Sequence, residues 1–294
     1  MPINPDVAVG AEVGTQEFSW TSSDVLLYHL AVGAGSRPGD NLSPEALRWT
    51  LDNSADGEDL QVLPSFAVVA PTFHALRPPS LALPGCDINL SQVVHGSQEV
   101  QVAGPLPTEG SASLTTRITD VWDKGKAAVI WQEGVATRPD DTELWRVRSS
   151  IFVKGEGGWG GDRGESTPVV VPDRAPDAST TYAVTPQQAL LYRLCGDRNP
   201  LHADPAFANA AGFDAPILHG LCTYAIVLRE VIDLLLDGDA TSVGGFSARF
   251  AGVVIPGETL ALSAWDEPYG IVVAATVGDD VRPALSDCLV TRVR

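Results

Sequence analysis

One segment constrains the fold of this 294-residue chain more than any other. Residues 218–238 read LHGLCTYAIVLREVIDLLLDG, a long run that is apolar almost all round. A helix on a protein surface keeps a polar face, so a helix that is apolar on nearly every side is one that other elements surround. Strand-like runs with β-branched residues and breaks at Pro, Gly and Asp follow at 242–255, 258–266, 269–277 and 284–293. We therefore predict a central helix wrapped by an antiparallel sheet.

The first half of the chain repeats this order of elements more weakly. Residues 24–33 read DVLLYHLAVG and residues 188–196 read QALLYRLCG, so the pattern LLYxL occurs once in each half. A less regular apolar run, PSFAVVAPTFHAL at 64–76, stands where the central helix of this half is expected. Strand-like runs follow at 89–102, 113–122, 127–135 and 143–153. Short turns suit antiparallel pairing, so we predict an α+β fold of two repeats, each with a long central helix wrapped by an antiparallel sheet.

A segment rich in glycine and proline separates the two halves. Residues 155–177 open with GEGGWGGDRG and continue with ESTPVVVPDRAPD. Glycine and proline at this density build neither a helix nor a central strand. We therefore predict an N-terminal repeat at 1–154, a linker at 155–180 and a C-terminal repeat at 181–294.

Charge and cysteine usage narrow the class of protein. The chain has 19 basic and 37 acidic residues, a net charge of −18, which disfavours nucleic acid and anionic membranes as partners. A polyanionic ligand would need local cations, for which Lys124, Arg198 and Arg249 are candidates. The cysteines are scattered and form no CxxC pair, which indicates neither a zinc site nor a disulfide framework. With neither an apolar membrane span nor a signal peptide, we expect a reduced, cytoplasmic protein.

The densest group of polar residues follows the second LLYxL helix. Residues 196–202 read GDRNPLH. A helix that ends at Gly196 leaves Asp197, Asn199 and His202 on one short loop, which Pro200 stiffens. A carboxylate, an amide and an imidazole are thereby presented together, and this set is suited to general acid–base catalysis.

A second motif, PILHG at 216–220, begins the long apolar helix. The first turn of a helix has free N–H groups at the positive end of its dipole. Gly220 would let a ligand oxygen approach these groups closely, which predicts an oxyanion hole. His219 is interpreted as a residue that fixes the turn.

A divalent metal is the competing interpretation of the polar loop. Asp197, Asn199, His202 and Asp204 all carry possible ligand atoms. Asp204 precedes Pro205, however, and is better explained as the N-cap of a short helix. We therefore predict no metal ion and no cofactor.

These motifs together resemble a known family. GDRNPLHADPAFA at 196–208, followed by GFDAPILHGLCTY at 212–224, resembles the signature of (R)-specific enoyl-CoA hydratases, also called hydratase 2 or MaoC-like dehydratases. ARFAGVVIPGETL at 248–260 is similar to the strand segment that follows it in that family. The first half resembles the two-domain members at VVHGSQEV, DVWDKGKAAVI and FVKGEGGWGG, residues 93–100, 120–130 and 152–161. The resemblance implies a double hotdog fold with a degenerate N-terminal repeat, which here has AGSRPGDN instead of a catalytic loop.

The resemblance also implies roles for individual residues. Asp197 and His202 activate one water for addition to C3 of a trans-2-enoyl-CoA, with a proton going to C2, or catalyse the reverse dehydration. Asn199 supports these groups, and the N–H of Gly220 binds the thioester oxygen. Substrate-binding positions are predicted at His95, Gly96, Lys124, Arg198, Pro200, Leu201 and Phe250. CoA is then part of the substrate, and an acyl carrier protein thioester is an alternative.

Other functions remain open from the sequence. A hotdog thioesterase would direct water to the carbonyl carbon, and a non-catalytic acyl-thioester binding protein would need neither Asp197 nor His202. No glycine-rich dinucleotide fingerprint follows a strand, which disfavours a redox role. By ordinary expectation Lys124 belongs to a hairpin turn and His95 to a strand surface. We also expect a homodimer, and an N-terminal repeat free to open a tunnel for the acyl chain.

Overall fold

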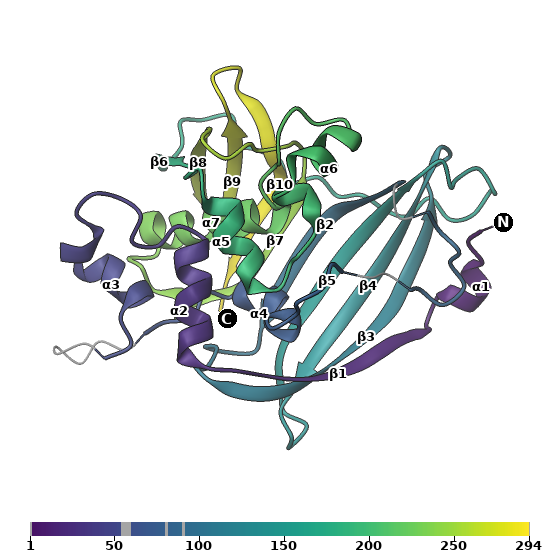
Figure 1. Cartoon of the computed structure of the whole chain (residues 1–294), viewed down its shortest axis with the longest axis horizontal. Helices are drawn as coiled ribbons and strands as arrows, with labels where there is room; N and C mark the ends of the chain where they lie inside the picture. The colour runs from purple at the N-terminus through teal and green to yellow at the C-terminus, as the bar shows by residue number, and fades with distance from the viewer. Residues whose placement is uncertain (1, 54–59, 80–81, 90–91, 294) are drawn as a thin grey trace.

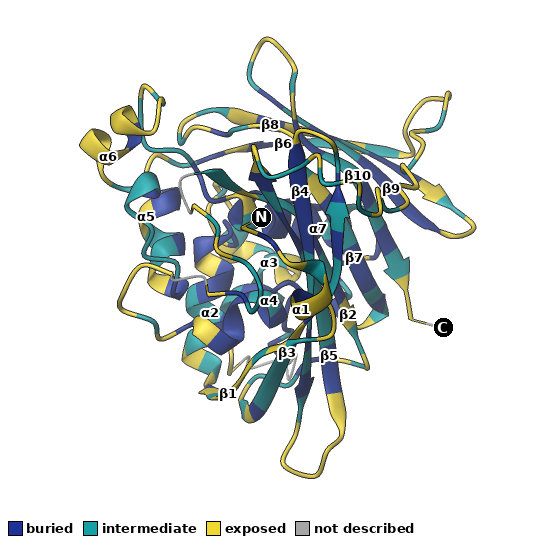
Figure 2. Cartoon of the chain, turned by 90° about the vertical axis from the view of Figure 1, so that its right-hand side faces the viewer, coloured by how far each residue is buried: buried dark blue, intermediate teal, exposed yellow. Residues whose placement is uncertain are grey.

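The computed structural model describes residues 2–53, 60–79, 82–89 and 92–293 of the chain. Within them the strands form one antiparallel sheet of ten, in the order β1-β3-β4-β5-β2-β7-β10-β9-β8-β6 (Figure 1). The first five in this order come from the N-terminal half and the last five from the C-terminal half. The sheet is thus two wrapped sheets joined edge to edge, with the helices on its concave side (Figures 1 and 2).

The N-terminal half consists of α1 (Pro5–Ala8), β1 (Glu12–Trp20), α2 (Ser22–Ala31), α3 (Pro44–Thr50), α4 (Phe66–Val69), β2 (Val93–Val102), β3 (Gly110–Asp123), β4 (Ala127–Thr137) and β5 (Glu143–Lys154). The C-terminal half consists of β6 (Ala178–Ala183), α5 (Gln188–Tyr192), α6 (Pro205–Ala210), α7 (Gly220–Leu235), β7 (Val243–Phe250), β8 (Thr259–Glu267), β9 (Gly270–Val277) and β10 (Arg282–Arg292). Each half therefore has a leading strand, a short helix, a central helix and four further strands. The strand expected at 89–102 begins at Val93 here, and its positions 90 and 91 lie outside the described residues.

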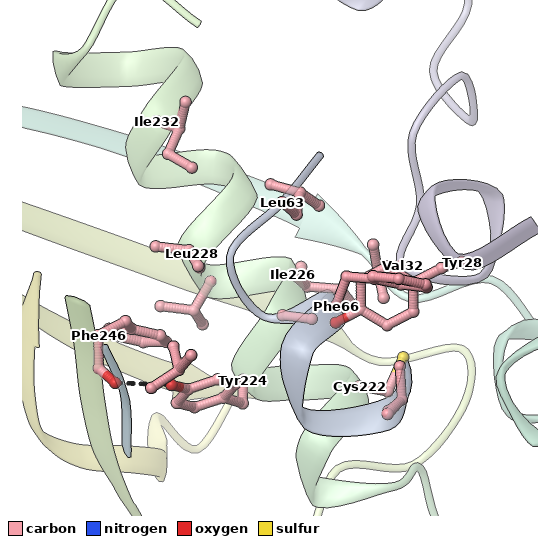
Figure 3. Close-up of a cluster of buried hydrophobic side chains, with 14 of the residues drawn as sticks. Tyr28, Val32, Leu63, Phe66, Cys222, Tyr224, Ile226, Leu228, Ile232 and Phe246 are labelled. Carbon is pink, nitrogen blue, oxygen red and sulfur yellow. Dashed lines mark hydrogen bonds between the residues drawn. The ribbon is translucent and has the colours of Figure 1, made fainter. Parts of the chain in front are cut away.

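The central helix of the C-terminal half is surrounded on all sides, as its sequence predicts. Every residue of α7 from Cys222 to Ile232 is buried. Figure 3 shows its side chains between Phe246 of β7 and residues of the N-terminal half, including Tyr28 and Phe66. The hydroxyl of Tyr224 donates a hydrogen bond of 2.7 Å to the carbonyl of Phe246, so this buried polar atom is satisfied. No helix in the described part of the chain has the length and hydropathy that a bilayer crossing requires.

The central helix of the N-terminal half is much shorter than the predicted one. Of the run at 64–76, only α4 is α-helical, and a 3₁₀ turn at Ala70–Thr72 follows it. Pro71 has no N–H to donate to the preceding turn, which ends the α-helix there. Aromatic rings occupy the space instead, with Trp20 and Trp145 5.7 Å apart between ring centroids and Phe66 and Phe73 5.8 Å apart.

The two halves meet where β2 pairs with β7. The register runs from Ser97 opposite Arg249 to Gln101 opposite Gly245. Because β2 and β7 are adjacent, residues of the N-terminal half reach the neighbourhood of the loop that precedes α7. Both halves of the chain therefore contribute residues to the region around this loop.

The glycine-rich segment after β5 follows the surface without helix or strand until β6 begins at Ala178. Its first part is fixed at the turn between β3 and β4. There the Asp123 carboxylate accepts hydrogen bonds from the backbone N–H groups of Gly158 and Gly160, each at 2.7 Å. These bonds lower the pKa of Asp123 to about 2, because they favour its ionised form. The segment is thus anchored by one carboxylate.

Candidate active site

The polar loop begins at a glycine that no other residue can replace without strain. Helix α5 starts at Gln188, two residues after Pro186, and continues as a 3₁₀ turn to Cys195. Gly196 then adopts a φ of +108°, and a Cβ there would lie 2.0 Å from the carbonyl oxygen of Thr72. The loop therefore starts in close contact with the backbone of the N-terminal half.

Short-range hydrogen bonds give the loop its shape. The Asp197 carboxylate accepts a bond of 3.0 Å from the N–H of Asn199. The Asn199 side-chain oxygen accepts one of 3.1 Å from the N–H of Leu201 and so caps the 3₁₀ turn Pro200–His202. Asn199 and Pro200 thereby fix the turn that carries His202. The carbonyl of Leu201 accepts a bond from Ile217, which ties this turn to the segment entering α7.

His202 is held in one tautomer. Its Nδ1 lies 2.9 Å from the carbonyl oxygen of Ile217, which can only accept, so Nδ1 carries the proton. The other ring nitrogen, Nε2, is then free to accept a proton when the ring is neutral. Burial lowers the pKa of His202, and this outweighs the opposing effects of the Ile217 bond and the negative charge of Asp197. His202 is therefore neutral at pH 7 and can act as a base.

The N-terminus of α7 lies beside this loop. His219 is the N-cap and Gly220 the first helical residue, whose N–H has no acceptor within the helix. Gly220 is exposed, and a Cβ there would lie 3.0 Å from the ring of Phe250. The space between Gly220 and Phe250 is therefore open only because residue 220 has no side chain. This arrangement suits an oxygen that develops negative charge.

His219 joins the catalytic group more closely than the sequence indicates. Its ring stacks on that of His202, with centroids 3.7 Å apart and 27° between the planes. Ligand-type atoms of Asp197, His202 and His219 all lie within 4.8 Å of one another. The three side chains form one cluster at the start of α7.

A metal ion fits this cluster poorly. Imidazole binds a metal through a lone pair that lies in the plane of the ring, at about 2.0–2.1 Å for zinc. The rings of His202 and His219 are stacked with only 27° between their planes, so two in-plane lone pairs do not both point at an ion at that distance. The cluster is better suited to proton transfer than to coordination.

Two family models match the chain, each over one half. The MFE-2 hydratase 2 N-terminal domain matches residues 18–155, and the MaoC like domain matches residues 168–279. An enoyl-CoA hydratase of Mycobacterium tuberculosis is 55% identical over 272 residues, which covers 92% of this chain and 92% of that protein. The chain belongs to the MaoC-like dehydratase family.

Further relatives agree with this assignment. The 3-hydroxyacyl-thioester dehydratase Y of Mycobacterium tuberculosis is 40% identical and covers 98% of this chain and 97% of its own. A crystal structure of a MaoC-like dehydratase from Phytophthora capsici superposes with a TM-score of 0.88 at 25% identity, over 99% of this chain and 98% of that one. A Mycobacterium tuberculosis protein described as a double hotdog has a TM-score of 0.60 at 12% identity, over 99% of this chain and 98% of its own. The predicted double hotdog fold is confirmed.

Two residues predicted to bind the substrate, His95 and Phe250, lie near Gly220 at the start of α7 in this dehydratase. The ring of His95 is 4.6 Å from that of Phe250, so β2 contributes to the wall that faces Gly220. Burial lowers the pKa of His95 to about 4, and its Nε2–H donates to the carbonyl of Ser97 at 3.1 Å. A Cβ on Gly96 would lie 2.6 Å from the hydroxyl of Ser150, so this glycine is required by strand packing as well.

The predicted cations lie farther out. Arg198 donates from Nε to the carbonyl of Ala75, 3.3 Å away, and so holds the loop against the N-terminal half. Lys124 lies over the ring of Trp122 at 4.8 Å and donates to the carbonyl of Arg163. It stands at the β3–β4 turn, so β4 and β5 separate it from His95. Arg249 is exposed on β7. Of the predicted residues, the structure thus gathers Asp197, Asn199, His202, Gly220, His95 and Phe250, but not Lys124.

Proposed function

We propose that this protein catalyses the (R)-specific hydration of trans-2-enoyl-CoA to (3R)-3-hydroxyacyl-CoA and the reverse dehydration. One observation carries the proposal. A buried, neutral His202 and the Asp197 carboxylate lie together beside the free N–H of Gly220 at the start of α7. A conjugated thioester needs these three elements, because its hydration requires an activated water, a proton for carbon and a stabilised oxyanion.

We propose the following course for the reaction. The thioester oxygen accepts the N–H of Gly220, which draws electron density away from C3. Asp197 and His202 Nε2 orient one water, whose oxygen forms the new bond to C3. The proton released from the water is returned to C2 on the same face as the enolate collapses. In total one water is added, with its hydroxyl on C3 and its hydrogen on C2.

The substrate is proposed to lie along the seam between the halves. His95, Gly96 and Phe250 would contact the thioester end, and Pro200 and Leu201 would border it on the loop side. Arg198 and Lys124 are proposed to meet the charged part of CoA, since the net charge of −18 makes local cations necessary. The chemistry itself requires no cofactor, because no electrons are transferred and the proton comes from water.

The acyl chain is proposed to enter the N-terminal half. The interior beside the short α4 is lined by the apolar rings of Trp20, Phe66 and Trp145, which we propose move aside as an alkyl chain enters. The division into repeats at 1–154 and 181–294 with a linker at 155–180 stays a proposal, beside one family match at 18–155 and another at 168–279. Comparison of short-, medium- and long-chain substrates tests this point, and a sharp loss of activity beyond short chains would contradict it.

Three further properties remain proposals. Four unpaired cysteines suit a reducing compartment such as the cytoplasm. A homodimer is proposed, and light scattering on the purified chain would test it. Substrates carried by CoA or by an acyl carrier protein can be compared directly in the same assay.

Loss of the conjugated-enoyl absorbance tests the proposed function. A medium-chain trans-2-enoyl-CoA should lose absorbance with the wild type and retain it with Asp197→Asn or His202→Ala. A thioesterase would instead release free CoA thiol, which a thiol reagent detects. Thiol release without hydration would replace the proposal by the thioesterase, and tight acyl-CoA binding without either reaction would make the chain a binding protein.

A further inference from the structure

His219 occupies an unusual position between the two catalytic residues. Its ring stacks on that of His202, with centroids 3.7 Å apart, and the ring of Tyr192 packs against it at a tilt, with centroids 4.9 Å apart. Only 1% of the residue is exposed. The ring of His202 is therefore covered on one face by His219, and His219 is covered in turn by Tyr192.

A hydrogen bond connects the same ring to the second catalytic residue. His219 Nε2 lies 3.4 Å from the backbone carbonyl oxygen of Asp197. A carbonyl oxygen only accepts, so the proton of the neutral His219 ring is on Nε2. One imidazole thus contacts His202 through its face and Asp197 through its edge.

The second nitrogen of this ring shows why an imidazole differs from an apolar ring here. His219 Nδ1 is buried and has no hydrogen-bond partner among the residues that the structure describes. Burial of an unpaired polar atom is unfavourable, and a phenyl ring would stack on His202 without it. What the imidazole adds is the Nε2–H bond to Asp197.

The surroundings of His219 keep it uncharged. The titratable and charged groups that act on it are His202 and Arg193, the backbone carbonyl of Asp197 accepts its hydrogen bond, and the phenol of Tyr192 packs against the ring at a tilt. Burial, followed by the proximity of His202, lowers the pKa of His219 to about 2. A neutral ring can cover His202 without placing a positive charge against it.

We propose that His219 is a positioning residue that locks His202 and Asp197 into one arrangement, a role that rests on the proposed hydratase function. His219 is also the N-cap of α7 and precedes Gly220, the oxyanion donor. His219 therefore contacts the ring of His202 and the backbone of Asp197 with its side chain, and it is joined to the Gly220 N–H through the peptide bond. A displacement of about 1 Å in such a group can reduce a rate about 10²-fold, so a lock of this kind has a measurable effect.

Two variants separate the two contacts. His219→Phe keeps the stacked ring and removes the bond to Asp197, whereas His219→Gln keeps an N–H donor and removes the ring. Both side chains fill most of the volume, and melting temperatures check that each variant is folded. His74→Gln is the matched control, because His74 is 64% exposed and lies outside the site.

The readouts are kcat, KM and the titration of His202 observed by NMR. The chain has five histidines, so the His202 signal can be assigned from its loss in His202→Ala. We expect kcat to fall at least about tenfold in both variants, with KM changed less than about threefold. We expect the pKa of His202 to rise toward its ordinary value in His219→Gln, where water reaches the uncovered ring, and to stay low in His219→Phe.

Any other pattern overturns the proposal, including an unchanged kcat in His219→Phe or an unchanged His202 titration in His219→Gln. The wild type supplies a test that needs no variant and no activity. Its ring ¹⁵N shifts should show His219 neutral, with the proton on Nε2, down to pH 4, and titration near the ordinary histidine value would refute the role. If the wild type does not hydrate enoyl-CoA, the proposed function fails, while the NMR result still decides whether His219 holds His202.

Discussion

The close approach at Gly196 predicts that Gly196→Ala disrupts the catalytic loop. A residue other than glycine at a φ of +108° is disfavoured by roughly 1–2 kcal/mol. The added Cβ would also lie 2.0 Å from the carbonyl oxygen of Thr72, well inside van der Waals contact. Moving that backbone or the loop costs roughly a further 1–3 kcal/mol. We therefore expect a loss of about 2–5 kcal/mol in unfolding free energy and at least about 10²-fold in kcat.

Gly212→Ala is the matched control for this prediction. Gly212 also has a positive φ, +89°, but a Cβ there would meet no atom of the described part of the chain within 4 Å. Gly212→Ala should lose only the unfolding free energy that the positive φ costs a non-glycine residue, about 1–2 kcal/mol, and it should keep its kcat. Urea unfolding and enoyl-CoA hydration measure both quantities. Equal stabilities and equal rates for the two variants would refute the argument that Gly196 positions the loop against the N-terminal half.

Three further predictions concern stability. Val281 has a φ of +55° on an exposed turn, so Val281→Asn should raise the unfolding free energy by about 1 kcal/mol in urea, and no gain would contradict the assigned backbone strain. His29 is fully buried with its pKa lowered from 6.5 to about 4, chiefly by burial, and it bonds Trp49 and Leu63 as a neutral ring. The unfolded state binds the proton more tightly, so this contribution is present above pH 6.5 and is lost as the pH falls toward 4, by at most about 3 kcal/mol. His29→Gln should show a shallower loss across that range than the wild type, and an identical slope would contradict the assignment. Asp123, with its pKa near 2, stabilises the glycine-rich segment above its ordinary pKa of 3.8, and this effect is lost as the pH falls toward 2. Asp123→Asn should therefore be cleaved faster within 155–164 in limited proteolysis at neutral pH, and equal cleavage would show that the segment is held by other contacts.

The parts of the fold that could be predicted from sequence are those with a strong local signal. α7 is apolar on nearly every side, and the loop from Gly196 to His202 has a glycine stop, a proline and a dense polar motif. Such features need little information from the rest of the chain. Their predicted positions agree with the structure to within a few residues.

The edge strands β1 and β6 were not predicted. Each pairs with one neighbour only, and most residues of β1 are exposed, so the alternation of apolar and polar residues that marks a half-buried strand is weak. Both become strands because β3 and β8 offer them partners. Their pairing is set by tertiary structure and leaves little trace in the local sequence.

The role of His219 could not be predicted for a related reason. The sequence places it beside Gly220, but its contact with His202 depends on how the 3₁₀ turn folds back on α7. That geometry is set by bonds such as those from Ile217 to Leu201 and from His202 to Ile217. The sequence does hold one signal for this role. It is a histidine at the N-cap of a buried helix, next to the glycine of a predicted oxyanion hole.

The most direct test of the central claim is the configuration of the hydration product. Wild-type protein would be incubated with a medium-chain trans-2-enoyl-CoA, and the product passed to dehydrogenases specific for (3R)- or (3S)-3-hydroxyacyl-CoA. The proposed (R)-specific hydration, with Asp197 and His202 activating the water near the N-terminus of α7, predicts a (3R) product that the first enzyme alone oxidises. A (3S) product, or none under conditions where the protein is folded and binds the thioester, would contradict the account.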